Sequence, residues 1–183
     1  MNKMYKFAFL FDKKNDWLKQ YLPKNINFRE DIKISYFYEE ENIKEFDVVF
    51  VLGFTRILKN DFLEVNSLVL IVHESNLPFG KGFSPLQWQI LEGKDKIVFS
   101  LLEASEEFDC GDIIDQIELK LDGIELYDEI RYKQAKLTFE LVENFMKHYP
   151  NYEKFKQFGK STYYRKRNIS DSELNINLPI KEL

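Results

Sequence analysis

Two short, uninterrupted apolar runs constrain the fold of this chain more than any other feature of its 183 residues. The first run covers residues 47–52 (DVVFVL) and ends at Gly53, and the second covers residues 67–72 (SLVLIV) and ends at His73. A strand that is apolar on both faces is typical of a parallel sheet covered by helices on both sides. Because residues 57–65 between the runs can supply a crossover helix, the pattern predicts an α/β fold.

Patterns of strand and helix length continue along the rest of the chain. Apolar runs predict four further strands, at residues 4–11, 32–37, 96–102 and 112–119. Helices are predicted at residues 17–22, 57–65, 85–91 and 125–146, and the last of these has apolar residues at helical spacing. Ser84 and Pro85 are the expected N-cap and first residue of the third helix. We therefore expect an α/β, Rossmann-like fold, with a mostly parallel twisted sheet flanked by helices.

Charge, cysteine content and hydropathy exclude several classes of protein. The formal net charge of −5 makes long polyanions such as nucleic acids poor partners. A single cysteine, Cys110, excludes a disulfide framework, and the two histidines are too far apart in sequence to suggest a metal site. The glutamates at residues 39–41 are expected to form a solvated loop. No apolar run reaches the roughly 18 residues of a membrane span. These features predict a reduced, cytoplasmic protein that binds neither nucleic acid, membrane nor metal.

The chain is expected to form one domain with a short appendage, as its length allows. Residues 1–150 contain nearly all of the strand and helix patterns. Residues 151–183 are polar and basic and include Tyr163, Arg165 and Arg167. We predict a domain at residues 1–150 followed by a short basic C-terminal extension at residues 151–183.

The ends of the two apolar runs are the expected place for a functional site. In an open parallel sheet, ligands bind beyond the carboxyl ends of the strands, where Gly53 and His73 lie. A histidine at such a position is either structural or catalytic, whereas His148, late in the long helix, is expected at the surface. The chain has no dinucleotide fingerprint, phosphate-binding loop or nucleophile elbow. Cys110 is conceivable as a reactive thiol, but no catalytic partner is implied.

The residues after the second run resemble a known family. Residues 73–78 (HESNLP) are similar to the H-x-S-x-L-P segment of the folate-dependent formyltransferases. The likeness continues through residues 82–93 and resumes at residues 106–112, where residues 109–111 (DCG) match a D-x-G loop. Residues 53–58 (GFTRIL) look like the segment that lines the folate site of that family. The resemblance implies that residues 1–150 are a formyltransferase catalytic domain.

Within that family, the chain resembles the sugar N-formyltransferases most. Residues 163–172 (YYRKRNISDS) are similar to the basic segment that follows their catalytic domain. The turn at residues 12–17 (DKKNDW) lacks the glycine- and serine-rich phosphate-binding sequence of the glycinamide ribonucleotide enzymes. We expect neither the C-terminal domain nor the basic tRNA-contacting loop of the methionyl-tRNA enzymes. The resemblance implies formyl transfer from 10-formyltetrahydrofolate to the amine of a nucleotide-linked amino sugar, in surface polysaccharide biosynthesis, by a monomer or homodimer.

The resemblance also assigns roles to individual residues. It implies that His73 and Asp109 are catalytic. It implies folate contacts from Gly53, Phe54, Ile57, Leu58, Glu106, Glu107 and Phe108. The candidates for contacting the acceptor are Asn76, Lys81, Gly82, Trp88, Tyr163 and Arg165. Without the resemblance, these residues also have structural interpretations. Ile57 and Leu58 fit a core role equally well, and Trp88 suits core packing. Lys81 and Arg165 suit solvent exposure.

One position departs from the family pattern. The family usually has an asparagine two positions before the histidine, where this chain has Ile71. Losing a donor to an oxyanion costs roughly 10²–10³ in rate, unless Asn76, a backbone N–H or water replaces it. Two alternatives to the sugar enzyme therefore stay open: a glycinamide ribonucleotide-type formyltransferase, and an inactive relative that binds folate or nucleotide.

Overall fold

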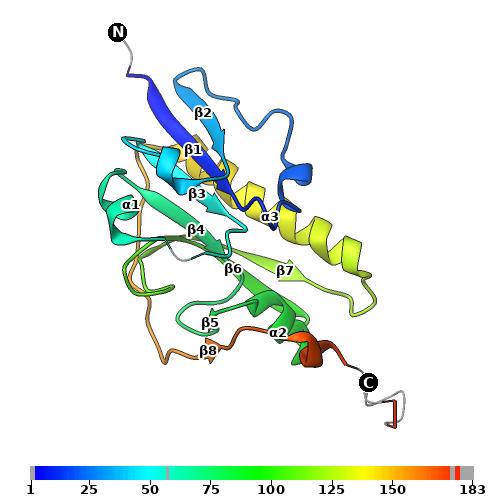
Figure 1. Ribbon diagram of the computed structural model, residues 1–183. Coiled ribbons are helices and arrows are strands. Elements are labelled where there is room, and N and C mark those ends of the chain that lie inside the picture. Colours follow the sequence, from blue (N-terminus) through cyan, green and yellow to red (C-terminus); the bar gives the residue numbers. More distant parts are fainter. Residues whose placement is uncertain (1–2, 57, 174–175, 178–183) are drawn as a thin grey trace.

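A six-stranded sheet with the order β2-β1-β3-β4-β6-β7 runs through the part of the chain that is described, residues 3–56, 58–173 and 176–177 (Figure 1). In this computed structural model the strands are β1 (Tyr5–Phe11), β2 (Ile32–Phe37), β3 (Val48–Leu52), β4 (Val69–His73), β6 (Lys96–Glu103) and β7 (Ile113–Lys120). The first four strands pair in parallel, whereas β6 and β7 are antiparallel to their neighbours. The expected α/β fold with a mostly parallel sheet is confirmed.

Both faces of the sheet are buried, which explains the apolar runs. Phe9 of β1 belongs to the core that includes side chains of α3 (Tyr127–His148), and Leu10 belongs to the core on the other face, with α1 (Asn60–Glu64). Figure 1 shows α3 running across one face of the sheet. Successive side chains of a strand point to opposite faces, so a strand covered on both sides is apolar throughout. This packing makes the sheet a rigid support for the loops at its carboxyl edge.

Two of the four expected helices are shorter than predicted, and a third begins later. The segment predicted at residues 17–22 forms only a 3₁₀ turn, η1 (Lys19–Tyr21), because Pro23 follows closely. The crossover helix is only one turn long, α1. Helix α3 begins two residues later than predicted, because the Glu125 carboxylate accepts the N–H groups of Asp122 and Gly123 in the preceding turn. Among the described residues, no helix is long and apolar enough to cross a membrane.

Helix α2 (Pro85–Leu91) has the predicted bounds, but its N-cap does not act as expected. Ser84 has a φ of 52°, in the left-handed region, and its side chain makes no capping hydrogen bond. In this conformation the Ser84 carbonyl still accepts the N–H of Trp88 at 3.1 Å. The expected serine cap is therefore wrong in its side-chain contact, although the helix starts where predicted.

Within residues 151–173, the C-terminal segment packs back onto the preceding part of the chain. Its strand β8 (Tyr163–Tyr164) pairs in parallel with β5 (Lys81–Gly82) in a second, two-stranded sheet, and the short helix η3 (Ile169–Ser172) follows. Figure 1 shows this orange segment passing alongside the sheet to reach β5. Phe155 forms an isolated bridge with Ile113 at the start of β7. Residues 151–173 therefore contact both β5 and the start of β7.

Candidate active site

A cavity of about 1230 Å³ opens at the carboxyl ends of the parallel strands. It exceeds the roughly 300–1,000 Å³ of a pocket for one small ligand, so it has room for two ligands. Of the residues that the sequence proposes for the site, those in its wall are Gly53, Phe54, Leu58, His73, Gly82, Glu106, Phe108, Asp109, Tyr163 and Arg165. The fold thus gathers residues from four separate segments of the chain around one space.

His73 and Asp109 meet in the wall of this cavity. His73 ends β4 and is 7% exposed, and Asp109 lies in the loop between β6 and β7. His73 Nδ1 is 3.5 Å from Asp109 Oδ1, and His73 Nε2 is 2.8 Å from the Gly80 carbonyl oxygen. Both ring nitrogens face acceptor oxygens, but a neutral imidazole has only one N–H to donate. A ring that takes up a second proton can donate to both, so this arrangement suits proton transfer.

Contacts from outside its own loop hold Asp109 in place. The Gly82 N–H donates to Asp109 Oδ2 at 2.8 Å. The side-chain amide of Gln157 donates to the backbone carbonyls of Asp109 and Gly111, at 2.8 and 2.9 Å. Asp109 has a φ of 52°, a left-handed conformation that costs a non-glycine residue roughly 1–2 kcal/mol. Gln157 lies in the extension, and no sequence pattern had indicated it.

The loop after β3 is fastened to the end of β1. The carboxylate of Asp12 accepts hydrogen bonds from the hydroxyl and N–H of Thr55 and from the N–H of Lys14. Burial alone raises the pKa of Asp12, but these hydrogen bonds outweigh it, and the pKa falls below its ordinary value. The ionised carboxylate therefore holds Gly53 and Phe54 in the cavity wall.

Aromatic and basic side chains of the extension pack on α2. The Trp88 ring stacks on Tyr164 with centroids 6.3 Å apart, and its Nε1–H donates to the Arg165 carbonyl at 2.9 Å. The Arg165 guanidinium lies over the Trp88 ring and makes two hydrogen bonds to the Asp171 carboxylate. The bond from Arg165 lowers the pKa of Asp171 to about 2, and burial raises the pKa of Tyr164. Arg165 lines the cavity with its charge already paired.

Some side chains that the sequence proposes for ligand contact lie outside the cavity wall. These are Asn76, Lys81, Trp88 and Glu107. Lys81 is buried, with 4% of the residue exposed, and its Nζ lies 2.7 Å from Cys110 Sγ. The Lys81 side chain therefore does not extend toward a ligand. Asn76 accepts a hydrogen bond from Gln116 of β7 at 3.3 Å. Ile57 lies outside the described residues.

Ile71 occupies the wall beside His73. The two residues are two positions apart in β4, so their side chains point to the same face of the sheet. Ile71 lines the cavity and is partly buried against the core. Its aliphatic side chain has no N–H to offer a developing oxyanion. The site therefore combines a histidine–carboxylate pair with an apolar surface at this position.

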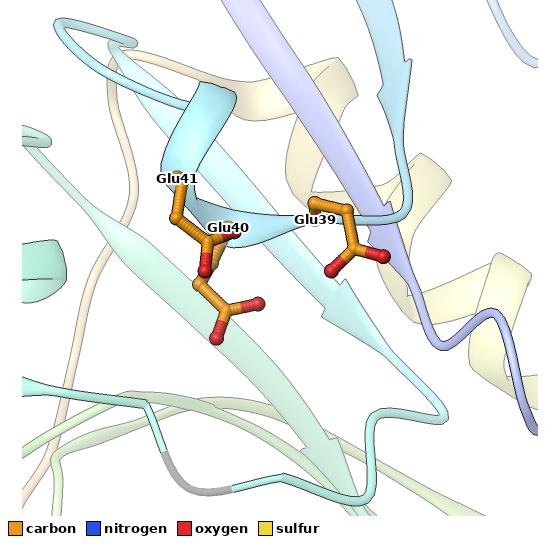
Figure 2. A group of neighbouring side chains, drawn as sticks. All are labelled: Glu39, Glu40 and Glu41. Atoms are coloured by element: carbon orange, nitrogen blue, oxygen red, sulfur yellow. The ribbon is translucent and has the colours of Figure 1, made fainter.

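In the described part of the chain, the glutamates at residues 39–41 are the one group of three or more neighbouring histidine, cysteine or acidic side chains that could hold a metal ion (Figure 2). Glu39 and Glu40 form ion pairs with Arg56, at 3.3 and 3.1 Å. Such exposed pairs contribute little to stability and are common on protein surfaces. Instead of a loop, the segment forms a 3₁₀ turn, η2 (Glu40–Asn42).

Known proteins resemble this chain in sequence. A family model described as formyl transferase matches residues 19–142. Methionyl-tRNA formyltransferase of Sulfurihydrogenibium sp. (strain YO3AOP1) is 28% identical over 150 residues, which are 78% of this chain and 48% of that protein. The chain thus spans about half the length of this curated relative.

Solved structures with the same fold include two formyltransferases. Methionyl-tRNA formyltransferase from Clostridium thermocellum has a TM-score of 0.79 and 18% identity, covering 98% of this chain and 80% of that one. The formyltransferase PseJ from Anoxybacillus kamchatkensis, in complex with UDP-4,6-dideoxy-4-formamido-L-AltNAc and tetrahydrofolate, has a TM-score of 0.60 and 19% identity. That match covers 95% of this chain and 92% of the other. At these identities the likeness shows the fold alone.

Proposed function

This chain belongs to the formyl transferase family, and from this premise we propose that it moves a formyl group from 10-formyltetrahydrofolate to the amine of a nucleotide-linked amino sugar. The observation that carries the proposal is the His73–Asp109 pair in the wall of a cavity large enough for a donor and an acceptor. Formyl transfer between two bound molecules needs this combination of a proton-transfer group and space for both.

His73 and Asp109 have separate tasks in this proposal. The attacking amine loses a proton as it bonds to the formyl carbon, and we assign the uptake of that proton to His73. Asp109, with Oδ1 facing the imidazole and Oδ2 held by the Gly82 N–H, stabilises the cation that forms. Holding donor and acceptor in line supplies several kcal/mol of the acceleration.

The apolar wall of the cavity suits the ring system of the donor. Phe54 and Leu58 line it together with Ile71, and Phe108 comes from the loop that carries Asp109. Apolar and aromatic walls with a few polar groups are typical of cofactor sites. When bound there, the folate supplies the formyl carbon and the nitrogen that leaves. The chain's own residues would orient it and exclude water.

The acceptor side rests on the part of the cavity that the extension lines. Tyr163, Arg165 and Lys166 contribute to the wall, so aromatic and basic groups face the space. Such groups suit the base and phosphates of a nucleotide. PseJ, which shares the fold, was solved with a UDP-linked formamido sugar. The net charge of −5 disfavours a tRNA, although the relative named above acts on methionyl-tRNA by its name.

An acceptor panel tests the proposal. The chain is incubated with 10-formyltetrahydrofolate and nucleotide-linked amino sugars, with glycinamide ribonucleotide and methionyl-tRNA in parallel, and product masses identify the acceptor. Formylation of a nucleotide sugar is expected. Transfer only to glycinamide ribonucleotide or to methionyl-tRNA would overturn the substrate assignment, and folate binding with no transfer at all would indicate an inactive relative.

Two variants test the mechanism. His73→Ala and Asp109→Asn are each expected to lower turnover at least about 10²-fold while the fold survives. His148→Ala is the matched control, because that exposed histidine bonds only the Asn144 carbonyl within α3 among the contacts described. Near-normal turnover in both site variants would remove the assigned roles.

A cytoplasmic location, a role in surface polysaccharide biosynthesis and a monomeric or homodimeric state remain predictions.

A further inference from the structure

Strand β5 and the loop before β7 meet at two adjacent points. At the first, the Gly82 N–H bonds to the carboxylate of Asp109. At the second, one residue away on each segment, Lys81 Nζ lies 2.7 Å from Cys110 Sγ. This separation is at the short end even for an N–H···O bond, although sulfur is the larger atom. The two side chains are therefore in direct contact, beside the proposed catalytic carboxylate.

The position of Lys81 is unusual for a lysine. The residue is 4% exposed, and within the described ranges no carboxylate oxygen lies within 4.0 Å of its Nζ. Its other neighbour is the Tyr163 ring, 5.9 Å from Nζ. Lysine is almost never fully buried without a charged partner, because desolvating the ammonium is costly. The buried amine is thus directed at sulfur and not at an acid.

Cys110 combines this contact with access to solvent. It is a free cysteine of intermediate exposure, so the residue is not sealed inside the core. Its loop is held by the Gln157 amide through the carbonyls on both sides of Cys110, those of Asp109 and Gly111. The sulfur and the lysine nitrogen are therefore kept at reacting distance by the fold, which is the condition for a fast reaction within one molecule.

We propose that Lys81 and Cys110 form an oxidative modification site, in which a peroxide converts the pair to a covalent sulfur–nitrogen link. In the first step hydrogen peroxide oxidises the Cys110 thiol to a sulfenic acid and is reduced to water. In the second, the Lys81 amine attacks the sulfur through its lone pair, and the sulfenic hydroxyl leaves with one amine proton as a second water. The S–N bond forms and the S–O bond breaks, so the cysteine is oxidised by two electrons in total.

The product fits the existing structure. The link would join the residues next to Gly82 and Asp109, which already share a hydrogen bond, so the two segments need little movement. It would also occupy the sulfur before a second peroxide makes the irreversible sulfinic acid. A thiol reductant would reopen the link, because a thiolate attacks the sulfur and releases the amine. The site therefore protects a cysteine that adjoins Asp109.

Mass spectrometry of the full chain after treatment with hydrogen peroxide tests the proposal. The expected product is about 2 Da lighter than the reduced protein, and dithiothreitol restores the original mass. Peptide mapping of the wild-type chain is expected to join the peptides that contain Lys81 and Cys110, which identifies the lysine without any variant. Addition of oxygen atoms to Cys110 with no joined peptide, or a link to a different lysine, would overturn it.

Variants sharpen the test. In Lys81→Met the joined peptide is expected to disappear, and Cys110 is expected to gain about 16 and then about 32 Da. Lys14→Met is the matched control, since Lys14 lies elsewhere in the cavity wall and is expected to leave the link unchanged. Equal cross-linking in Lys81→Met and wild type would contradict the assignment. None of these mass measurements depends on formyl transfer. A negative result for the sulfur–nitrogen link is therefore distinguishable from a failure of the proposed function.

Discussion

Replacing Gln157 by glutamate perturbs the Asp109 loop from the C-terminal extension. A carboxylate cannot donate to the carbonyls of Asp109 and Gly111, which now receive bonds of 2.8 and 2.9 Å. Each hydrogen bond contributes roughly 0.5–1.5 kcal/mol net to the free energy of unfolding, so losing both lowers it by about 1–3 kcal/mol. The Oε1 atom of Gln157 is buried, so the new charge would be poorly solvated, and it would also face the two carbonyl oxygens that the amide now bonds. Asp109 then loses the support that offsets its left-handed backbone.

The consequence for catalysis is expected to exceed the consequence for stability. A displacement of the Asp109 carboxylate by about 1 Å is enough to cost roughly 10²-fold in rate. Turnover and KM are measured well below the unfolding temperature of each variant, with thermal unfolding followed in parallel. We expect kcat to fall by about 10-fold to 10²-fold with KM changed much less, because Gln157 acts on a proton-transfer group and not on binding.

Two comparisons make this prediction refutable. Gln157→Met removes the donors without adding charge and is expected to lower kcat less than the glutamate variant does. Phe158→Ala changes a neighbour that is 96% exposed and is expected to leave both kcat and stability unchanged. A glutamate variant that unfolds at lower temperature but retains wild-type kcat would show that Gln157 is merely structural, and the positioning argument would fail.

Three further predictions follow from the same region. A methyl group on Gly111 would lie 1.8 Å from the Glu103 carbonyl oxygen, so Gly111→Ala is expected to displace the loop and lower kcat about 10²-fold; wild-type kinetics would contradict the contact. Ile71→Asn is expected to raise kcat, by up to about 10²–10³, by adding a donor on the face that His73 shares; an unchanged kcat in the folded variant argues against a missing donor. Arg165 lowers the pKa of Asp171 from 3.8 to about 2. Their ion pair therefore stabilises the extension fully above the pKa of Asp171 in the unfolded chain, and this stabilisation is lost as the pH falls through about 2. A carboxyl NMR signal of Asp171 that titrates near its ordinary value would exclude the pair.

Much of the sheet was predictable from local patterns. The strand at residues 32–37 and the helix at residues 85–91 have their predicted bounds, and the other strands of the six-stranded sheet differ by one or two residues at their ends. The short strands β5 and β8 were not predicted. Strand alternation and helix periodicity are short-range properties, so they can be read from neighbouring residues. The missing Ser84 cap was not visible in the sequence, because no local pattern indicated the left-handed backbone of that residue.

The sequence by itself determined the fold class and brought out His73 and Asp109 as candidates, because apolar periodicity and ordered motifs are local signals. Only the tertiary structure decided that Lys81 is buried against Cys110, and that Gln157 holds the Asp109 loop. Those contacts join segments that lie 29 and 48 positions apart. Contacts between such distant segments leave no periodic or local pattern in the chain, so they emerge only when the segments pack together.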